Sequence, residues 1–155
     1  MVNVALGIDY GEARIGVAVS DALGMLAHPV ETIHRAKVED PAGRIAQIAG
    51  ERGAGVVVIG MPYRMDGTKG GAAERVEAFI AALRKALPPG IAIAEVDERL
   101  TTVEAQRKLN AAGRGARESR SVIDQAAAVE ILQDYLNSQN GPSALLLPDP
   151  WDEEE

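Results

Sequence analysis

The run from Val56 to Ile59 is the feature that most constrains how this chain can fold. Its four residues are all apolar and β-branched, so a strand formed by them has no polar face to turn toward water. Strands of this kind lie inside a sheet whose two faces are both covered, usually by helices. The run therefore predicts a sheet with helices on both sides.

Three further strands are predicted before this run. Residues 2–9 are mostly apolar, residues 15–20 alternate large and small side chains, and residues 25–33 form the third segment. Pro29 has no amide hydrogen to donate, so we expect the third strand at an edge of the sheet. Because short turns join the three segments, they are predicted to form an antiparallel meander.

The rest of the chain is predicted to alternate helices and strands. Helices are expected over 40–53, 72–87, 101–112 and 121–136, a strand over 91–97, and a loop over 110–121. Thr101 with Glu104, and Ser121 with Asp124, have the spacing of capping boxes at helix starts. This order predicts an α/β fold with a mixed five-stranded sheet flanked by helices. Residues 1–137 are expected to form one domain, and 138–155 an acidic, flexible tail.

Composition limits the chemistry that this chain can perform. The sequence has no cysteine and only two histidines, His28 and His34. Disulfides, thiolate zinc sites and cysteine nucleophiles are therefore excluded, and a metal would be a hard ion such as Mg²⁺ or Mn²⁺. No segment is long and apolar enough to span a membrane, and no secretory signal is evident. We therefore expect a cytoplasmic protein with no membrane partner.

The net charge of −7 is unevenly distributed along the chain. Residues 99–120 hold six basic and two acidic side chains, whereas residues 121–155 hold eight acidic and none that are basic. A local basic segment can bind phosphate although the whole protein is acidic. The alternative is that residues 99–120 form an ordinary solvated helix and loop.

Asp9 is the first candidate for chemistry. It ends the first predicted strand and is followed closely by Gly11, where the chain leaves the sheet. Metal-binding carboxylates are often found at such positions. The alternative is an aspartate that hydrogen bonds to the backbone of its own turn.

Asp97 and Glu98 stand at the end of the last predicted strand. Alternation places Asp97 on the same face as Glu95, and places Glu98 on the face formed by small apolar residues. A carboxylate on an apolar face needs a partner or a metal. The alternative is a simple ion pair between Glu98 and Arg99 at the strand end.

Asp124 is an acidic residue on an otherwise apolar helical face, which it shares with Ala128, Ile131 and Tyr135. This position favours a functional role. The alternative is a capping role, because an acidic residue also stabilises a helix N-terminus.

The glycine-rich segment 60–71 precedes a predicted helix. Its backbone amides, together with Thr68 and Lys69, could bind a phosphate. The Gly-Lys-Ser/Thr order of a Walker A loop is absent, and a tight turn with a helix cap explains the segment equally well.

Taken together, these segments resemble the YqgF (RuvX) family. The resemblance rests on GIDYG at 7–11 with RIGVAVSD at 14–21, GMP at 60–62 with MDGT at 65–68, DERLTT at 97–102, and Asp124 with Ala127 and Ala128. It extends over residues 4–137. The family has an RNase H-like fold related to that of the junction resolvase RuvC, and its members are regarded as nucleases that mature the 5′ end of pre-16S rRNA.

The resemblance implies an acidic triad of Asp9, Glu98 and Asp124, which would bind Mg²⁺ or Mn²⁺ and cleave a phosphodiester bond. Asp97 is the alternative middle ligand if the strand register differs by one residue, and we favour Glu98. Contacts to the phosphates of pre-rRNA or branched DNA are expected from the following basic residues: Arg14, Lys69, Arg114, Arg117 and Arg120.

Three other functions are alternatives to rRNA processing. The first is resolution of Holliday junctions, for which a homodimer with two active sites is a hypothesis. The second is a non-catalytic module that binds RNA or the ribosome. The third is a nucleotide-binding domain of the actin or sugar-kinase type, which also has Asp-x-Gly before its second strand, but the chain has room for only one of the two domains that such proteins use.

Overall fold

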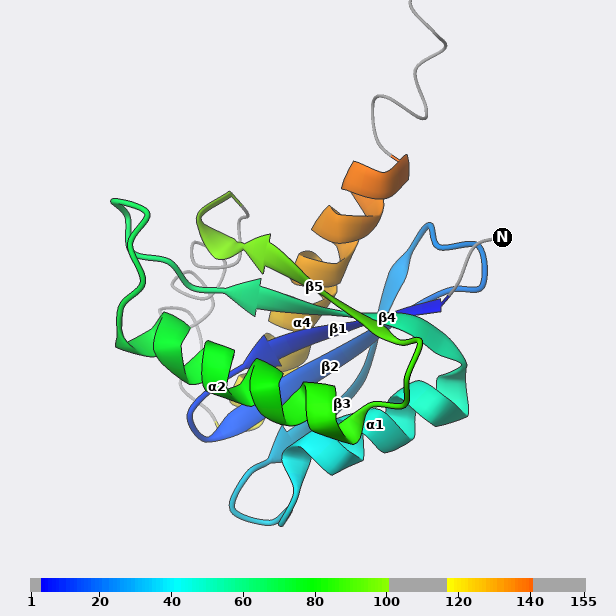
Figure 1. The fold of residues 1–155 in the computed structure, drawn as a ribbon, viewed down its shortest axis with the longest axis horizontal. Helices are drawn as coiled ribbons and strands as arrows, with labels where there is room; N and C mark the ends of the chain where they lie inside the picture. Colours follow the sequence, from blue (N-terminus) through cyan, green and yellow to red (C-terminus); the bar gives the residue numbers. More distant parts are fainter. Residues whose placement is uncertain (1–3, 101–116, 141–155) are drawn as a thin grey trace, which may run out of the picture.

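The computed structural model describes residues 4–100 and 117–140 (Figure 1). In chain order the elements are β1 (Val4–Tyr10), β2 (Arg14–Ser20), β3 (Ala27–His34), α1 (Pro41–Arg52), β4 (Ala54–Met61), α2 (Gly71–Ala86), β5 (Ala92–Asp97), the short 3-10 helix η1 (Glu98–Leu100) and α4 (Arg117–Asn140). All five predicted strands are present, with bounds that differ from the expected ones by at most two residues. The predicted helix over 101–112 lies outside the described residues.

The five strands form one mixed sheet in the order β3-β2-β1-β4-β5. β1 pairs antiparallel with β2, and β2 with β3, as the predicted meander requires. β4 lies parallel to both β1 and β5. The predicted α/β class and the mixed five-stranded sheet are therefore confirmed.

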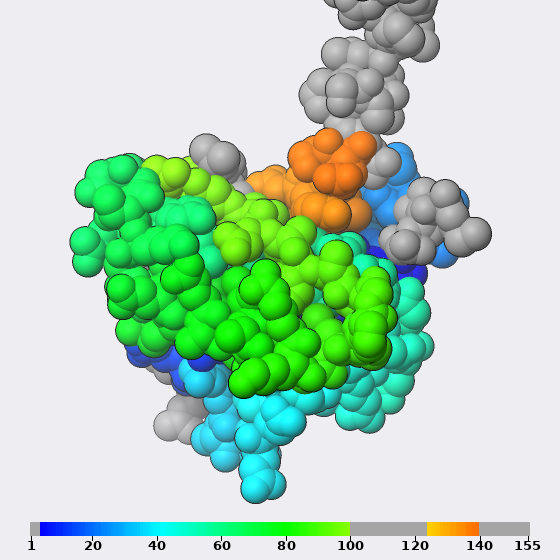
Figure 2. Space-filling view, in the orientation of Figure 1, coloured from blue at the N-terminus to red at the C-terminus, as the bar shows by residue number. Residues whose placement is uncertain are grey.

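Helices cover both faces of the sheet (Figure 1). α1 and α2 pack on one face, where large residues such as Leu6, Ile8 and Ile45 form the main core. The space-filling view shows α2 in green and β5 in yellow-green on this side of the molecule (Figure 2). α4 packs on the other face against small or β-branched residues, including Ala5 and Val58.

β4 confirms the prediction made from its apolar run. Val57 and Ile59 belong to the core beneath α1 and α2, whereas Val58 belongs to the core beneath α4. All three side chains are buried. β-Branched residues suit this position because a strand covered on both sides gains from packing in both directions.

Single residues explain the edge position of β3 and the two ends of α1. β3 lies at the edge of the sheet, as Pro29 predicts, and its register with β2 shifts between Val17 and Ala18. α1 begins after Asp40, whose side chain accepts a hydrogen bond from the backbone N–H of Gly43. It ends at Gly53, which adopts the left-handed conformation that favours glycine.

The last helix begins earlier than the sequence predicts. α4 starts at Arg117, so residues 117–120 are helical and Ser121 lies inside the helix. Arg and Glu are good helix formers, and no Gly or Pro interrupts residues 116–140. The interpretation of Ser121 and Asp124 as a capping box is therefore wrong. The boundary predicted after residue 137 also falls within α4, which continues to Asn140.

Among residues 4–100 and 117–140, no helix has both the length and the apolar character that crossing a membrane requires.

Glycines let α4 approach the backbone of the sheet. Gly7, Gly16 and Gly60, from β1, β2 and β4, all lie beneath this helix. A Cβ atom on Gly7 would lie 2.5 Å from the Cβ of Leu132, and one on Gly16 would collide with the carbonyl oxygen of Asp124. The backbone of α4 therefore lies closer to the strands than it could if these three glycines carried side chains.

This close packing predicts a strong effect of one methyl group. Gly7→Ala is expected to lower the free energy of unfolding by about 1–3 kcal/mol, because the added carbon overpacks the contact with Leu132. Gly50→Ala is the matched control, since a Cβ at this position in α1 meets nothing within 4 Å. It should stabilise the helix by about 0.5–1 kcal/mol. Urea denaturation measures both, and equal stability of the two variants would contradict the prediction.

Candidate active site

Asp9 is a buried carboxylate at the end of β1. Only 2% of the residue is exposed. In the antiparallel pair it lies opposite Gly16 of β2, and directly opposed residues place their side chains on the same face of a sheet. Gly16 lies against α4, so the Asp9 side chain also points to the α4 side.

Asp124 lies over Gly16, the residue of β2 that is paired with Asp9. Its carbonyl oxygen occupies the space next to Gly16 where a side chain would otherwise project. The absence of a side chain at Gly16 thus brings this part of α4 onto the sheet beside Asp9. Asp124 lies two turns inside the helix, so its carboxylate is not needed as an N-cap.

Glu98 approaches Asp9 from the opposite side. It begins η1, and only 6% of the residue is exposed. A Cβ on Gly60 would lie 2.8 Å from the Oε2 atom of Glu98. Because Ile8 is paired with Ile59 in the parallel register, Gly60 lies at the level of Asp9. Glycines on both neighbouring strands therefore make room for one acidic residue on either side of Asp9.

Asp97, the alternative middle acid, has a different environment. Its carboxylate binds the Arg99 guanidinium, with an ion-pair distance of 2.6 Å, and accepts the Arg99 backbone N–H at 2.9 Å. The side-chain hydrogen bond from Arg99 lowers the pKa of Asp97 below its usual range. Arg99 also lies over the ring of Tyr63. This network fixes the strand end and the start of the loop before α2.

Arg14 binds Asp124 directly. Its Nε donates to the Oδ2 of Asp124 at 2.6 Å, and the two side chains are 26% and 15% exposed. The sequence predicts a phosphate contact for Arg14, and in the structure Arg14 pairs with one of the three candidate acids. The two residues are 110 positions apart, so this pairing had no local signal in the sequence.

The three acidic residues suit a hard cation in their chemistry. All three offer carboxylate oxygens, and two of them are buried, as Mg²⁺ or Mn²⁺ ligands commonly are. Within the described part of the chain, however, no three acidic or histidine side chains are close enough together to hold an ion as they stand. The ion pair with Arg14 occupies one carboxylate oxygen of Asp124.

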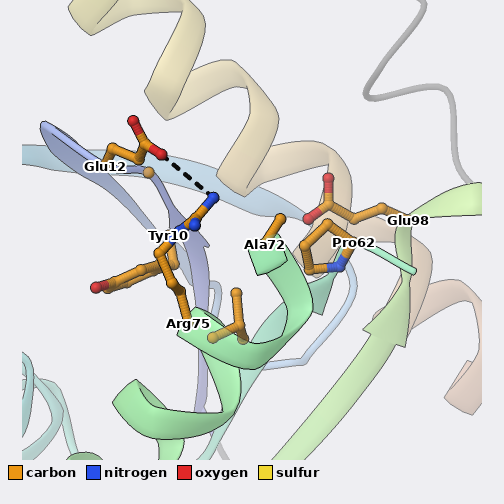
Figure 3. Close-up of a pocket in the computed structure, with 8 residues that line it drawn as sticks. Tyr10, Glu12, Pro62, Ala72, Arg75 and Glu98 are labelled. Atoms are coloured by element: carbon orange, nitrogen blue, oxygen red, sulfur yellow. Dashed lines mark ion pairs between the residues drawn. The ribbon is translucent and has the colours of Figure 1, made fainter. Parts of the chain in front are cut away.

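A cleft of about 190 Å³ lies beside Glu98 (Figure 3). The first turn of α2 and the β1–β2 turn form its other walls, and Arg75 of the helix pairs with Glu12 of the turn at 3.2 Å. Figure 3 shows Glu98 on one side of this cleft and Tyr10 with the Glu12–Arg75 pair on the other. Sequence reasoning missed Arg75, although it lies one helical turn after Ala72, at the end of α2 nearest the acids.

Arg35 holds the turn that follows Asp9. Its Nη1 donates to the carbonyl oxygens of Gly11 and Glu12, at 3.2 and 2.7 Å. The same guanidinium lies 4.8 Å from the centre of the Tyr10 ring, and Tyr10 packs on Phe79 of α2. Sequence analysis did not identify Arg35 because its role depends on tertiary contacts.

The other predicted phosphate contacts belong to three different segments of the chain. Lys69 pairs with Glu77 on the exposed side of α2, and the same pairing raises the pKa of Lys69. Arg117 and Arg120 belong to the first turn of α4. Arg114 lies outside the described residues.

The mixed five-stranded sheet with helices on both faces is an RNase H-like fold. The structure is similar to that of Thermus thermophilus RuvC in complex with a Holliday junction substrate, with a TM-score of 0.55 and 16% sequence identity. The match covers 89% of this chain and 96% of that one. At this identity the likeness establishes the fold alone.

The chain belongs to the RuvX family, whose sequence model is described as "Holliday junction resolvase" and matches residues 3–138. A relative from Nocardia farcinica named "Putative pre-16S rRNA nuclease" is 50% identical over 87% of this chain and 78% of its own length. Relatives of the same name from Acetivibrio thermocellus and a Nocardioides species are 45% and 44% identical, covering 86% and 92% of this chain and 95% and 92% of their own lengths. The predicted family is confirmed.

The Asp97–Arg99 pair predicts how stability depends on pH. Since the folded-state pKa of Asp97 is lowered, the pair stabilises the fold above the ordinary Asp pKa of about 3.9. This contribution is lost as the pH falls through the lower folded-state value. Asp97→Asn should therefore reduce stability at pH 7 and flatten its decline below about pH 4.

Chemical denaturation at a series of pH values measures this effect. Glu95→Gln, which changes an exposed carboxylate on the same strand, should keep the wild-type pH dependence. An unchanged pH dependence in Asp97→Asn would show that the pair does not stabilise the fold.

Proposed function

We propose that this protein is a metal-dependent endonuclease that cleaves phosphodiester bonds near the 5′ end of pre-16S rRNA in the cytoplasm. The observation that carries the proposal is that Asp9, Glu98 and Asp124 all lie on the α4 side of the sheet. They come from β1, η1 and α4, and Gly16 and Gly60 leave space on that side for Asp124 and Glu98. Burying carboxylates costs free energy unless a cation or hydrogen bonds compensate for it.

The three carboxylates would hold Mg²⁺ or Mn²⁺, with Asp9 between the other two acids. When bound, the metal supplies an activated water and neutralises charge on the phosphoryl oxygens. Asp9 and Glu98 lie on the sheet side of the site, and Asp124 on the helix side. Their fixed strand and helix positions would orient the scissile phosphate between them.

The relatives favour RNA over DNA as the substrate. Proteins named for pre-16S rRNA are 44–50% identical to this chain, whereas the junction-bound RuvC is 16% identical. The second candidate is Holliday junction resolution, which the family description supports. That activity would need two active sites, and hence a homodimer. A non-catalytic RNA- or ribosome-binding module is less well supported, because such a module does not need buried acids.

The test is a substrate panel with the wild-type protein and Asp9→Asn. A pre-16S 5′ precursor RNA and a four-way DNA junction are each incubated with Mg²⁺ or Mn²⁺. We expect cleavage of the RNA, and a loss of at least about 100-fold in Asp9→Asn because the central carboxylate is removed. Gel analysis of end-labelled substrates measures both rates.

Asp40→Asn is the matched control for this experiment. It makes the same chemical change at the N-cap of α1, where asparagine caps equally well. Junction cleavage without RNA cleavage would favour the second candidate. Undiminished cleavage by Asp9→Asn would remove the mechanism altogether.

The basic residues before Asp124 are proposed to contact the nucleic-acid backbone. Replacing Arg114 and Arg117 by alanine should weaken RNA binding and lower the slope of log affinity against log salt by about one for each phosphate that is no longer neutralised. Arg84→Ala, at the far end of α2, should leave that slope unchanged. Binding titrations at several salt concentrations measure the slope. An unchanged slope in the double variant would mean that these arginines do not contact the nucleic-acid backbone and belong to an ordinary solvated segment.

A further inference from the structure

The ion pair between Arg14 and Asp124 places a cation inside the acidic centre. Arg14 begins β2, two residues before Gly16. Residues two apart on a strand project from the same face, so Arg14 lies on the α4 side, as Asp9 does. Gly11 donates its backbone N–H to the Arg14 carbonyl oxygen, which fixes this residue directly across the turn from the end of β1.

Arg14 differs in this respect from other arginines around the site. Arg75 pairs with Glu12, and Arg99 pairs with Asp97. Neither of those acids belongs to the proposed triad. Arg14 instead engages a triad carboxylate through its Nε at 2.6 Å, a distance typical of a strong charge-assisted hydrogen bond.

A cation at this position stabilises the ionised Asp124 on the face of the sheet where Asp9 and Glu98 are buried. Like charges in a shared, partly buried site disfavour one another's ionised form, and a guanidinium among them relieves part of that cost. The same interaction occupies an Asp124 oxygen that a metal ion would need. A guanidinium and a divalent cation near one carboxylate also repel each other.

We infer that Arg14 competes with the metal ion for Asp124. In the metal-free protein Arg14 holds Asp124, and metal binding displaces it. The released guanidinium then faces the site, where it can bind a phosphate oxygen of the substrate. This inference rests on the proposed function, because it takes Asp124 as a metal ligand.

The first test follows the arginine side chains of the wild-type protein by NMR. The Nε–H of Arg14 should be protected from solvent exchange without metal and become exposed to exchange on titration with Mg²⁺. Arg44 is the internal control, because its Nε donates in the same way to Glu31 at 3.0 Å on elements that form no part of the site. Mg²⁺ binding that leaves the Arg14 signal and its protection unchanged would overturn the inference.

The second test measures Mn²⁺ binding by calorimetry in matched variants. Arg14→Gln should bind Mn²⁺ about five-fold more tightly than the wild type, since the competing cation is gone. Arg44→Gln removes a pair of the same length and should bind Mn²⁺ as the wild type does. Equal or weaker binding by Arg14→Gln would overturn the inference while leaving the proposed function intact. Absence of saturable Mn²⁺ binding in every protein would overturn both.

Discussion

The packing of the α4 backbone on the glycines of the sheet is the contact on which the position of Asp124 depends. Gly7 and Gly16 set how closely the helix approaches, and that approach brings Asp124 to the end of β1. A larger residue at either position would separate helix and sheet, since packed interiors have little spare volume. Stability and the placement of Asp124 thus depend on the same contact, and the core on this side is built from small residues such as Ala5 and Ala18.

The two faces of the sheet differ in the side chains that they bury. The side beneath α1 and α2 contains the larger side chains and supplies most of the buried apolar area, which is the main favourable term in folding. The side beneath α4 contains fewer apolar residues and also accommodates the carboxylates. Buried acids lower stability unless they are compensated, so the larger core contributes stability to a fold that also buries Asp9 and Glu98. Functional sites commonly depend on surplus stability from elsewhere in the fold.

The sequence predicts features set by local rules and misses those set by distant contacts. The apolar run of β4, the Asp40 cap and the edge position of β3 follow from residue properties that act within a few positions, and the structure confirms them. The start of α4 was predicted wrongly because Ser121 resembles a cap, whereas helix propensity extends the helix by another turn. The partner of Arg14 could not be predicted, because only the packing of α4 on β2 joins residues 110 positions apart.

The distribution of charge reconciles an acidic protein with a polyanionic substrate. Carboxylates cluster where the strands end, and arginines on neighbouring elements neutralise several of them: Arg14 from β2, Arg75 from α2 and Arg99 from η1. An arginine paired with a carboxylate is held in place and can still exchange partners, because exposed or half-exposed pairs are worth little in free energy. An incoming phosphate can therefore recruit these guanidinium groups at small cost. Release of Asp124 by Arg14 would leave that carboxylate available to a metal ion, so that binding of metal and of substrate would favour each other.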